Sequence, residues 1–243
     1  MSVWHAFAWG GLSSSALYIG WALAAPLKRA DRVTGLVMGF GAGTLLSAIA
    51  YELIPQTNLQ QGLDVGIAFV LGALVYYFGD RIVDGRGGAD RQQIGGTGAE
   101  TGSGAAMFLG ALLDGIPEAF ILGIGLGIGG SVSIAFITAV FVSNVPQGVA
   151  GTSSLRAAGS SSRRIFWMWT ALTATCAIVA ALGFLVAEVL HAQGIYAAAF
   201  AAGAVLTMLA NSMMPEALEH GGPTVGLVTV LGFLIAGALT LVP

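Results

Sequence analysis

The chain has 243 residues and a formal net charge of −3; 56% of its residues are hydrophobic and only 9% are charged. Soluble domains carry about 25% charged residues, and the mean hydropathy of +0.85 is far above their range. Composition therefore excludes an ordinary soluble protein, and we expect no nucleic-acid partner. It predicts an all-α integral membrane protein whose residues 1–243 form a single transmembrane domain in a lipid bilayer.

Small residues and the N-terminal segment refine this prediction. Lipid supplies no hydrophobic drive between helices, so the 37 glycines suit backbones that approach closely in a compact bundle. Residues 1–29 have no basic stretch before their apolar run, the reverse of a secretory signal, and we interpret them as a retained first span. The single cysteine, Cys176, lies inside an apolar run and supports neither a disulfide framework nor a zinc-thiolate site.

Apolar stretches of about 20 residues, the length that crosses the hydrocarbon core, predict eight transmembrane helices. They cover approximately residues 3–25, 33–55, 62–82, 105–129, 131–155, 165–190, 194–216 and 223–242. The glycine-rich polar segment 84–104 has no apolar periodicity and predicts a flexible loop. This loop divides the predicted spans into three and five.

The basic residues give the predicted topology a direction. All nine lie in the first, third and fifth predicted loops: Lys28, Arg29, Arg32, Arg81, Arg86, Arg91, Arg156, Arg163 and Arg164. Because Lys and Arg accumulate in short cytoplasmic loops, we expect these loops inside and both termini outside. The sequence thus predicts a multi-pass protein of the cytoplasmic membrane. The five tryptophans lie near predicted span ends, as interfacial residues do.

The chain aligns with itself at an offset of 160 residues. FGAGTLLSAIAYELIPQ (40–56) matches FAAGAVLTMLANSMMPE (200–216), and Pro55 pairs with Pro215. Spans two and seven run in opposite directions, so the alignment predicts an inverted repeat of helices 1–3 and 6–8 around helices 4–5, an architecture of secondary transporters. The alternative, that Ala- and Gly-rich spans resemble each other by composition, stays open. A second, shorter internal similarity aligns the proline-bearing segments 113–123 and 142–152.

Two carboxylates lie near the middle of the fourth predicted span. Asp114 and Glu118 stand at i and i+4, on one face of a helix, and counting 1.5 Å per residue places them close to the membrane centre. An ionised carboxylate costs several kcal/mol there and is by default functional and paired. Spans four and five contain no Lys or Arg at that depth. The partner must be a cation from outside, a proton or other polar side chains.

The fifth predicted span brings polar side chains to the same depth: Ser143, Asn144 and Gln147. Pro117 and Pro146 each remove one backbone N–H, which frees a carbonyl one turn earlier. Carboxylate, amide, hydroxyl and carbonyl oxygens suit hard or borderline divalent ions such as Mg, Mn, Fe(II) or, less typically, Zn. The alternative is that the two carboxylates are protonated and fasten the bundle through hydrogen bonds.

Further polar residues give weaker signals. Glu52 and Asn211 occur one position apart in the aligned repeat and are deep enough to reach the same interior. Glu216, Glu219 and His220 cluster at the inner end of the seventh span. That cluster fits either an exit for a cation or a solvated helix end.

The span order and the two motifs DGIPEA (114–119) and SNVPQG (143–148) resemble the ZIP family of divalent metal transporters. The resemblance covers the whole chain in span order, while its specific motifs occupy about a dozen residues. The family carries His-Asn-x-Pro-Glu-Gly-like motifs on spans four and five, which form a midplane metal site. By position, Asp114 replaces the family's histidine, Gly115 its asparagine, and Glu118 is its glutamate. Ser143 and Asn144 take the first two positions of the second motif.

Gln147 then stands in place of an acidic ligand, and Asn211 about where span seven often supplies one. The resemblance implies transport into the cytoplasm of a divalent metal cation, among Zn, Fe, Mn, Co and Cd, as substrate, with no enzymatic activity and no organic cofactor. Both motif histidines are absent, so we expect one ion, bound mainly by Asp114, Glu118 and Gln147, and a preference for harder ions. Two alternatives stay open: a proton-coupled permease for a non-metal substrate, and a transport-inactive ZIP-like scaffold or sensor. The oligomeric state also stays open, a homodimer included.

Overall fold

The structure is a computed structural model that describes residues 2–25, 31–53, 62–88, 104–129, 134–190 and 194–239. Every regular element in these ranges is a helix, which confirms the all-α prediction for this part of the chain. The elements are α1 (Val3–Ser14), α2 (Ala16–Leu23), α3 (Asp31–Ala48), η1 (Ile49–Leu53), α5 (Leu63–Val83), η2 (Asp84–Gly88), α6 (Gly104–Gly129), α7 (Ile134–Ala157), α8 (Ser162–Leu190), α9 (Gly194–Met208), η5 (Leu209–Met213), α10 (Met214–Gly221) and α11 (Val225–Leu239). The three η segments are π-helical.

Several of these helices fit a membrane protein. Five stretches within the described ranges are long and apolar enough to cross a bilayer: Asp31–Tyr51, Leu63–Gly87, Gly104–Gly127, Ser162–Val189 and Ile195–Gly221. A shorter apolar helix, Val225–Leu239, follows. The polar side chains of α7 lower its hydropathy, and the first predicted span is divided between α1 and α2. The count of eight spans stays a prediction.

Each predicted span falls on a helix, and the boundaries differ at one notable place. The loop predicted to begin at residue 84 begins later, because helical structure continues through η2 to Gly88. Gly87 has a φ of 90°, a conformation that glycine adopts without steric cost, and this marks the end of the helical run. The rest of the predicted loop, residues 89–103, lies outside the described residues.

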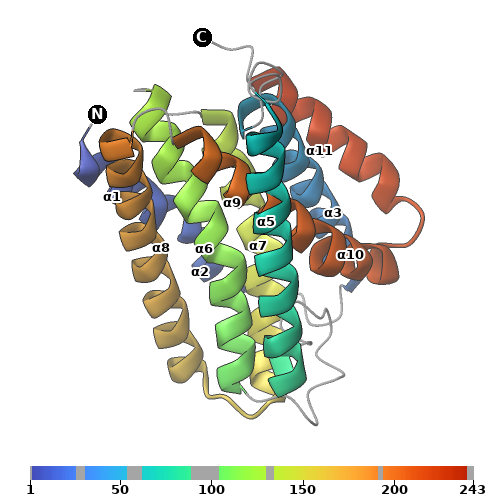
Figure 1. The fold of residues 1–243 in the computed structure, drawn as a ribbon. Helices are drawn as coiled ribbons and strands as arrows, with labels where there is room; N and C mark the ends of the chain where they lie inside the picture. Colours follow the sequence, from blue (N-terminus) through green and yellow to red (C-terminus); the bar gives the residue numbers. More distant parts are fainter. Residues whose placement is uncertain are drawn as a thin grey trace.

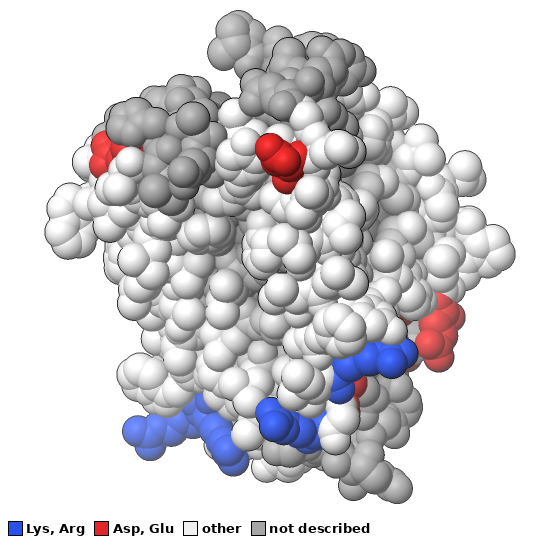
Figure 2. Space-filling model, in the orientation of Figure 1, with Lys and Arg blue, Asp and Glu red and all other residues white. Residues whose placement is uncertain are grey.

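The helices lie alongside one another in a bundle (Figure 1). The start of α1 and the end of α11 lie at the same end of the molecule, at the top of the view. The Arg side chains visible in Figure 2 gather at the opposite end. This separation agrees with basic loops that share one side; which side faces the cytoplasm stays a prediction.

Glycines bring α5 and α9 into backbone contact. A Cβ placed on Gly203 would collide with the carbonyl oxygen of Phe69, and a Cβ on Gly72 would collide with that of Phe200. No side chain fits at either position, so these glycines set the distance between the two helices. Such close approach is how helices associate where lipid provides no hydrophobic drive.

The α3–α11 pair is built in the same way. A Cβ on Gly43 would collide with the carbonyl oxygen of Thr229, and a Cβ on Gly232 with that of Phe40. The offset of the sequence alignment, 160, relates the positions of the two interfaces. Adding it to 40, 43, 69 and 72 gives 200, 203, 229 and 232. The two interfaces therefore use equivalent positions with the order of the helices exchanged.

The π-helical segments η1 (Ile49–Leu53) and η5 (Leu209–Met213) obey the same offset. Each ends two residues before one of the matched prolines, Pro55 and Pro215. A proline removes a helical N–H and its ring clashes with the carbonyl four residues earlier, and a π-helical segment is one way to accommodate it. The offset thus relates backbone irregularities as well as packing contacts.

Candidate metal centre

Helix α6 carries both predicted carboxylates into the interior. Asp114 and Glu118 are only 1% and 2% exposed, and Pro117 lies inside the helix between them. The two side chains stand one turn apart on one face. The sequence places them there because the residues around them are apolar and continue the helix past the proline.

Tyr76 on α5 supplies a partner for Asp114. Its hydroxyl donates a short hydrogen bond to Asp114 Oδ1, and both groups are buried. A hydrogen bond from a fixed phenolic donor holds a carboxyl group in one orientation. Asp114 is therefore held in a defined position before any ligand arrives.

Glu118 differs from Asp114 because one of its oxygens is unpartnered. Glu118 Oε1 is fully buried and has no hydrogen-bond partner within the described residues. A buried polar atom left without a partner costs about 1–3 kcal/mol, and more when it is charged. Such an atom needs an explanation, and an absent ion is one of the recognised ones.

Helix α7 contributes two amides whose oxygens can act as acceptors. Asn144 donates through Nδ2 to the carbonyl of Val140 at 2.9 Å and to that of Ser13 at 3.5 Å. Gln147 donates through Nε2 to Met213 Sδ at 3.9 Å. Both amides thus use their nitrogens on the protein, which leaves Asn144 Oδ1 and Gln147 Oε1 as acceptors.

These groups border one small pocket between four helices. It is lined by Leu17, Ala111, Asp114, Gly115, Asn144, Gln147, Trp169 and Leu172, and its free volume of about 10 Å³ for a water-sized sphere is roughly the room for one water or ion. The polar lining consists of one carboxylate and two amides from α6 and α7. The structure therefore brings together three of the predicted ligands, with Glu118 one turn away.

The remaining predicted residues lie elsewhere. Ser143 is buried, but its hydroxyl donates to the carbonyl of Val140 at 2.9 Å, and its backbone packs against Gly41 of α3. Asn211 is exposed on the surface of η5, contrary to the expectation that it lines the interior. The π-helical segment turns its side chain away, and Met213 meets Gln147 instead. Glu52 belongs to η1, and its side chain lies outside the described part of the structure.

Three residues near the site were not foreseen from the sequence. Trp169 is 2% exposed and donates to Thr152 Oγ1 at 2.9 Å, so its interpretation as an interfacial residue was wrong. Trp169 lies near the end of a predicted span, so the sequence did not indicate that its side chain lines the pocket. Tyr76 lies at mid-depth in an apolar span, where a tyrosine hydroxyl needs a partner; that signal was available. Met213 has no such signal, because methionine is an ordinary apolar filler.

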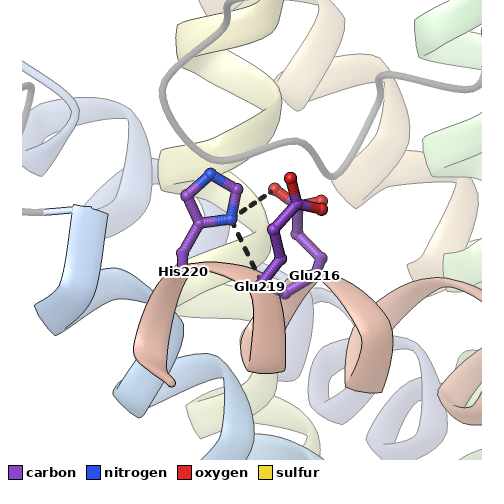
Figure 3. A group of neighbouring side chains, drawn as sticks. All are labelled: Glu216, Glu219 and His220. Atoms are coloured by element: carbon purple, nitrogen blue, oxygen red, sulfur yellow. Dashed lines mark hydrogen bonds and ion pairs between the residues drawn. The ribbon is translucent and has the colours of Figure 1, made fainter.

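A second group of candidate ligands lies on α10. Figure 3 shows Glu216, Glu219 and His220 on one face of this helix, with ligand atoms within 4.8 Å of one another. His220 Nδ1 lies 3.2 Å from Glu216 Oε1. Positions i, i+3 and i+4 bring any three side chains together on a helix surface, and Glu219 is exposed. This group is therefore a weaker candidate than the buried pocket.

The pocket can hold a cation. It offers carboxylate and amide oxygens, the donor set of hard divalent ions, from two neighbouring helices. No known protein family matches the chain by its sequence profile, and no curated protein is significantly similar to it. Any argument for its function must therefore come from the site itself.

Proposed function

We propose that this chain is a divergent ZIP-like transporter of the cytoplasmic membrane, which carries a divalent metal cation such as zinc, iron or manganese into the cytoplasm. The observation that carries the proposal is the Oε1 of Glu118, which has no partner in the described part of the chain. It lies one turn from a pocket lined by a second carboxylate and two amides. A divalent cation would satisfy these oxygens together. The alternative, in which Asp114 and Glu118 are both protonated, does not explain why two amides lie beside them.

The fold supports the rest of the proposal. The glycine contacts of α3 with α11 and of α5 with α9 share the offset of 160, as an inverted repeat in a 3+2+3 arrangement of eight spans would require. Inverted repeats place their substrate sites near the midplane, between the halves. The basic end of the molecule (Figure 2) would face the cytoplasm under the positive-inside rule.

In this mechanism the site residues replace the hydration shell of the ion. Asp114, oriented by Tyr76, and Glu118 supply negative charge, and the amide oxygens of Asn144 and Gln147 complete the coordination. Because the ligands must be deprotonated, binding releases protons and depends on pH.

Metal-dependent thermal stabilisation tests the proposal. We expect Mn, Zn, Co, Cd or Fe(II) to raise the melting temperature of the chelator-treated protein in detergent, since a ligand at 100 times its Kd stabilises the native state by about 2.7 kcal/mol. Asp114→Asn and Glu118→Gln should abolish the rise. A variant with Glu216→Gln, Glu219→Gln and His220→Ala should keep it; the reverse pattern would move the site to α10.

Transport is tested separately in liposomes that contain a metal-sensitive dye. Wild type should admit the ion, and Glu118→Gln should not. Metal binding without flux would favour a scaffold or sensor. Proton flux without any metal-dependent stabilisation would favour a permease in which Asp114 and Glu118 carry protons.

A further inference from the structure

A second layer of polar side chains lies one helical turn beyond the pocket, toward the end that carries the start of α1. On α6, Glu118 follows the pocket residue Asp114 by four positions. On α8, Cys176 follows Leu172 by four, and on α1 Ser14 precedes Leu17 by three. Helices α6 and α8 run in the same direction and α1 runs oppositely (Figure 1), so all three steps lead to the same level.

The thiol of Cys176 lies against the site. Its Sγ is 3.7 Å from the carbonyl oxygen of Gly115, a residue that lines the pocket. A Cβ added to Gly115 would come to 3.2 Å from this sulfur, so the thiol packs directly behind the glycine. Ser14 hydrogen-bonds the thiol, and the charge of Glu118 acts on it. Cys176 is 1% exposed.

Glu118 gives this layer an unsatisfied oxygen. Its Oε1 has no partner within the described residues. A buried cysteine in an ordinary core behaves as a small apolar residue, whereas Cys176 lies near this carboxyl group. A thiol, a hydroxyl and an orphaned carboxylate oxygen at one level form a mixed sulfur and oxygen donor set. Thiolate sulfur is a soft ligand that favours ions such as Zn and Cd over Mn and Mg.

We propose that Cys176 is a metal ligand, which together with Glu118 forms a second cation position beside the oxygen-lined pocket and biases the protein toward soft and borderline divalent ions. The inference rests on the proposed function, because it concerns the same conduction site. On binding, the thiol gives its proton to water and the sulfur donates an electron pair to the metal. No redox change is involved.

The chain contains a single cysteine, so any thiolate signal belongs to Cys176. The experiment titrates metal-free protein in detergent with Cd²⁺ and, separately, with Mn²⁺, and records ultraviolet thiolate-to-cadmium charge-transfer absorption together with affinity. Wild type should show the absorption band with Cd²⁺. Cys176→Ser should lose the band and bind Cd²⁺ at least about tenfold more weakly, while its Mn²⁺ affinity stays within about threefold. Thr175→Ala is the matched control and should behave as wild type. The hydroxyl that it removes donates to the carbonyl of Ala171 on the same helix.

Two results would overturn the inference, and they are distinguishable. If wild type binds Cd²⁺ without the band, and Cys176→Ser keeps the ratio of Cd²⁺ to Mn²⁺ affinity, then the thiol is no ligand while the proposed function stands. If neither ion binds wild type, both proposals fall. The band and the protection of Cys176 from alkylation by Cd²⁺ are measured on wild type, so the inference remains testable even if the serine variant misfolds.

Discussion

Tyr76 donates a hydrogen bond across the α5–α6 interface to Asp114 Oδ1. Helix α5 contributes no residue to the pocket lining, and its main packing partner among the described helices is α9. The carboxylate of Asp114 is therefore oriented by a helix that does not itself line the pocket. Any movement of α5 relative to α6 would change the position of a ligand.

Replacing Tyr76 with phenylalanine removes this donor and keeps the ring. Partners that orient a metal ligand are worth roughly 10–100-fold in metal affinity, so we expect Tyr76→Phe to weaken metal binding by that factor. The free energy of unfolding should fall by about 1–2 kcal/mol because Asp114 loses a buried hydrogen bond. Tyr77→Phe, on the neighbouring position, is the control. Equal metal affinities of Tyr76→Phe and Tyr77→Phe in calorimetric titration would contradict the positioning role.

Glu118→Gln should separate stability from binding. The substitution replaces a buried carboxyl group, whose Oε1 has no partner within the described residues, with a neutral amide that carries no cost of charge burial. In metal-free buffer we expect the variant to be as stable as wild type or more stable, by about 1–3 kcal/mol. Chemical denaturation in detergent with chelator present measures this difference. A variant clearly less stable than wild type would show that Glu118 is a structural hydrogen-bonding group.

Gln147→Glu should strengthen cation binding. A second carboxylate in the pocket lining adds negative charge next to Asp114, and the oxygen donor set becomes more suited to hard divalent ions. We expect at least about tenfold higher Mn²⁺ affinity, since tenfold corresponds to only about 1.4 kcal/mol. The metal-free protein should be less stable, because the carboxylate cannot donate to Met213. Gln147→Ala, which removes the oxygen altogether, should weaken Mn²⁺ binding; similar affinities of the two variants would exclude Gln147 as a ligand.

The glycine contacts predict paired effects at equivalent positions. Gly43→Ala and Gly203→Ala each place a methyl group against a backbone carbonyl of the facing helix. Overpacking typically costs about 1–3 kcal/mol, and a rigid backbone carbonyl gives way less than a side chain. Both variants should therefore lower the melting temperature.

Gly66→Ala on α5 is the matched control, because nothing lies within 4 Å of its added Cβ. Alanine in an open helical position is worth up to about 1 kcal/mol relative to glycine, so this variant should be neutral or more stable. Similar melting temperatures for Gly66→Ala and Gly203→Ala would contradict the close packing of α5 and α9.

Much of the fold follows from patterns that the lipid environment imposes on a sequence. Apolar runs of bilayer length located the helices, because an unpaired backbone cannot lie in lipid and the helix satisfies it. The offset of 160 identified Gly43 and Gly203 as equivalent before their contacts were known. The end of the third span was wrong by several residues, because the helix persists into the polar segment as far as Gly88, beyond the apolar signal.

The site was predictable along one helix at a time. The i and i+4 spacing predicted that Asp114 and Glu118 share one face of a helix. The rise per residue predicted that Asn144 and Gln147 lie at the same depth in the bilayer. Periodicity within one helix could not predict which side chains meet between helices. The exposed position of Asn211 lies in a π-helical segment that a periodicity of 3.6 residues does not register. The approach of Cys176 to Gly115 depends on how closely α8 packs against the glycine-rich helix α6.

The pairing of α3 with α11 has a consequence for biosynthesis. Thr229 on α11 donates to the carbonyl of Gly39 across 190 residues of sequence, at 3.0 Å. Chains emerge from the ribosome N-terminus first, at about 5–20 residues per second, so α3 enters the membrane long before its partner exists. During that interval its glycine face is exposed to lipid or to other proteins. The packing of α3 is therefore not completed until α11 has been synthesised, and truncation before residue 225 removes one of the surfaces on which α3 packs.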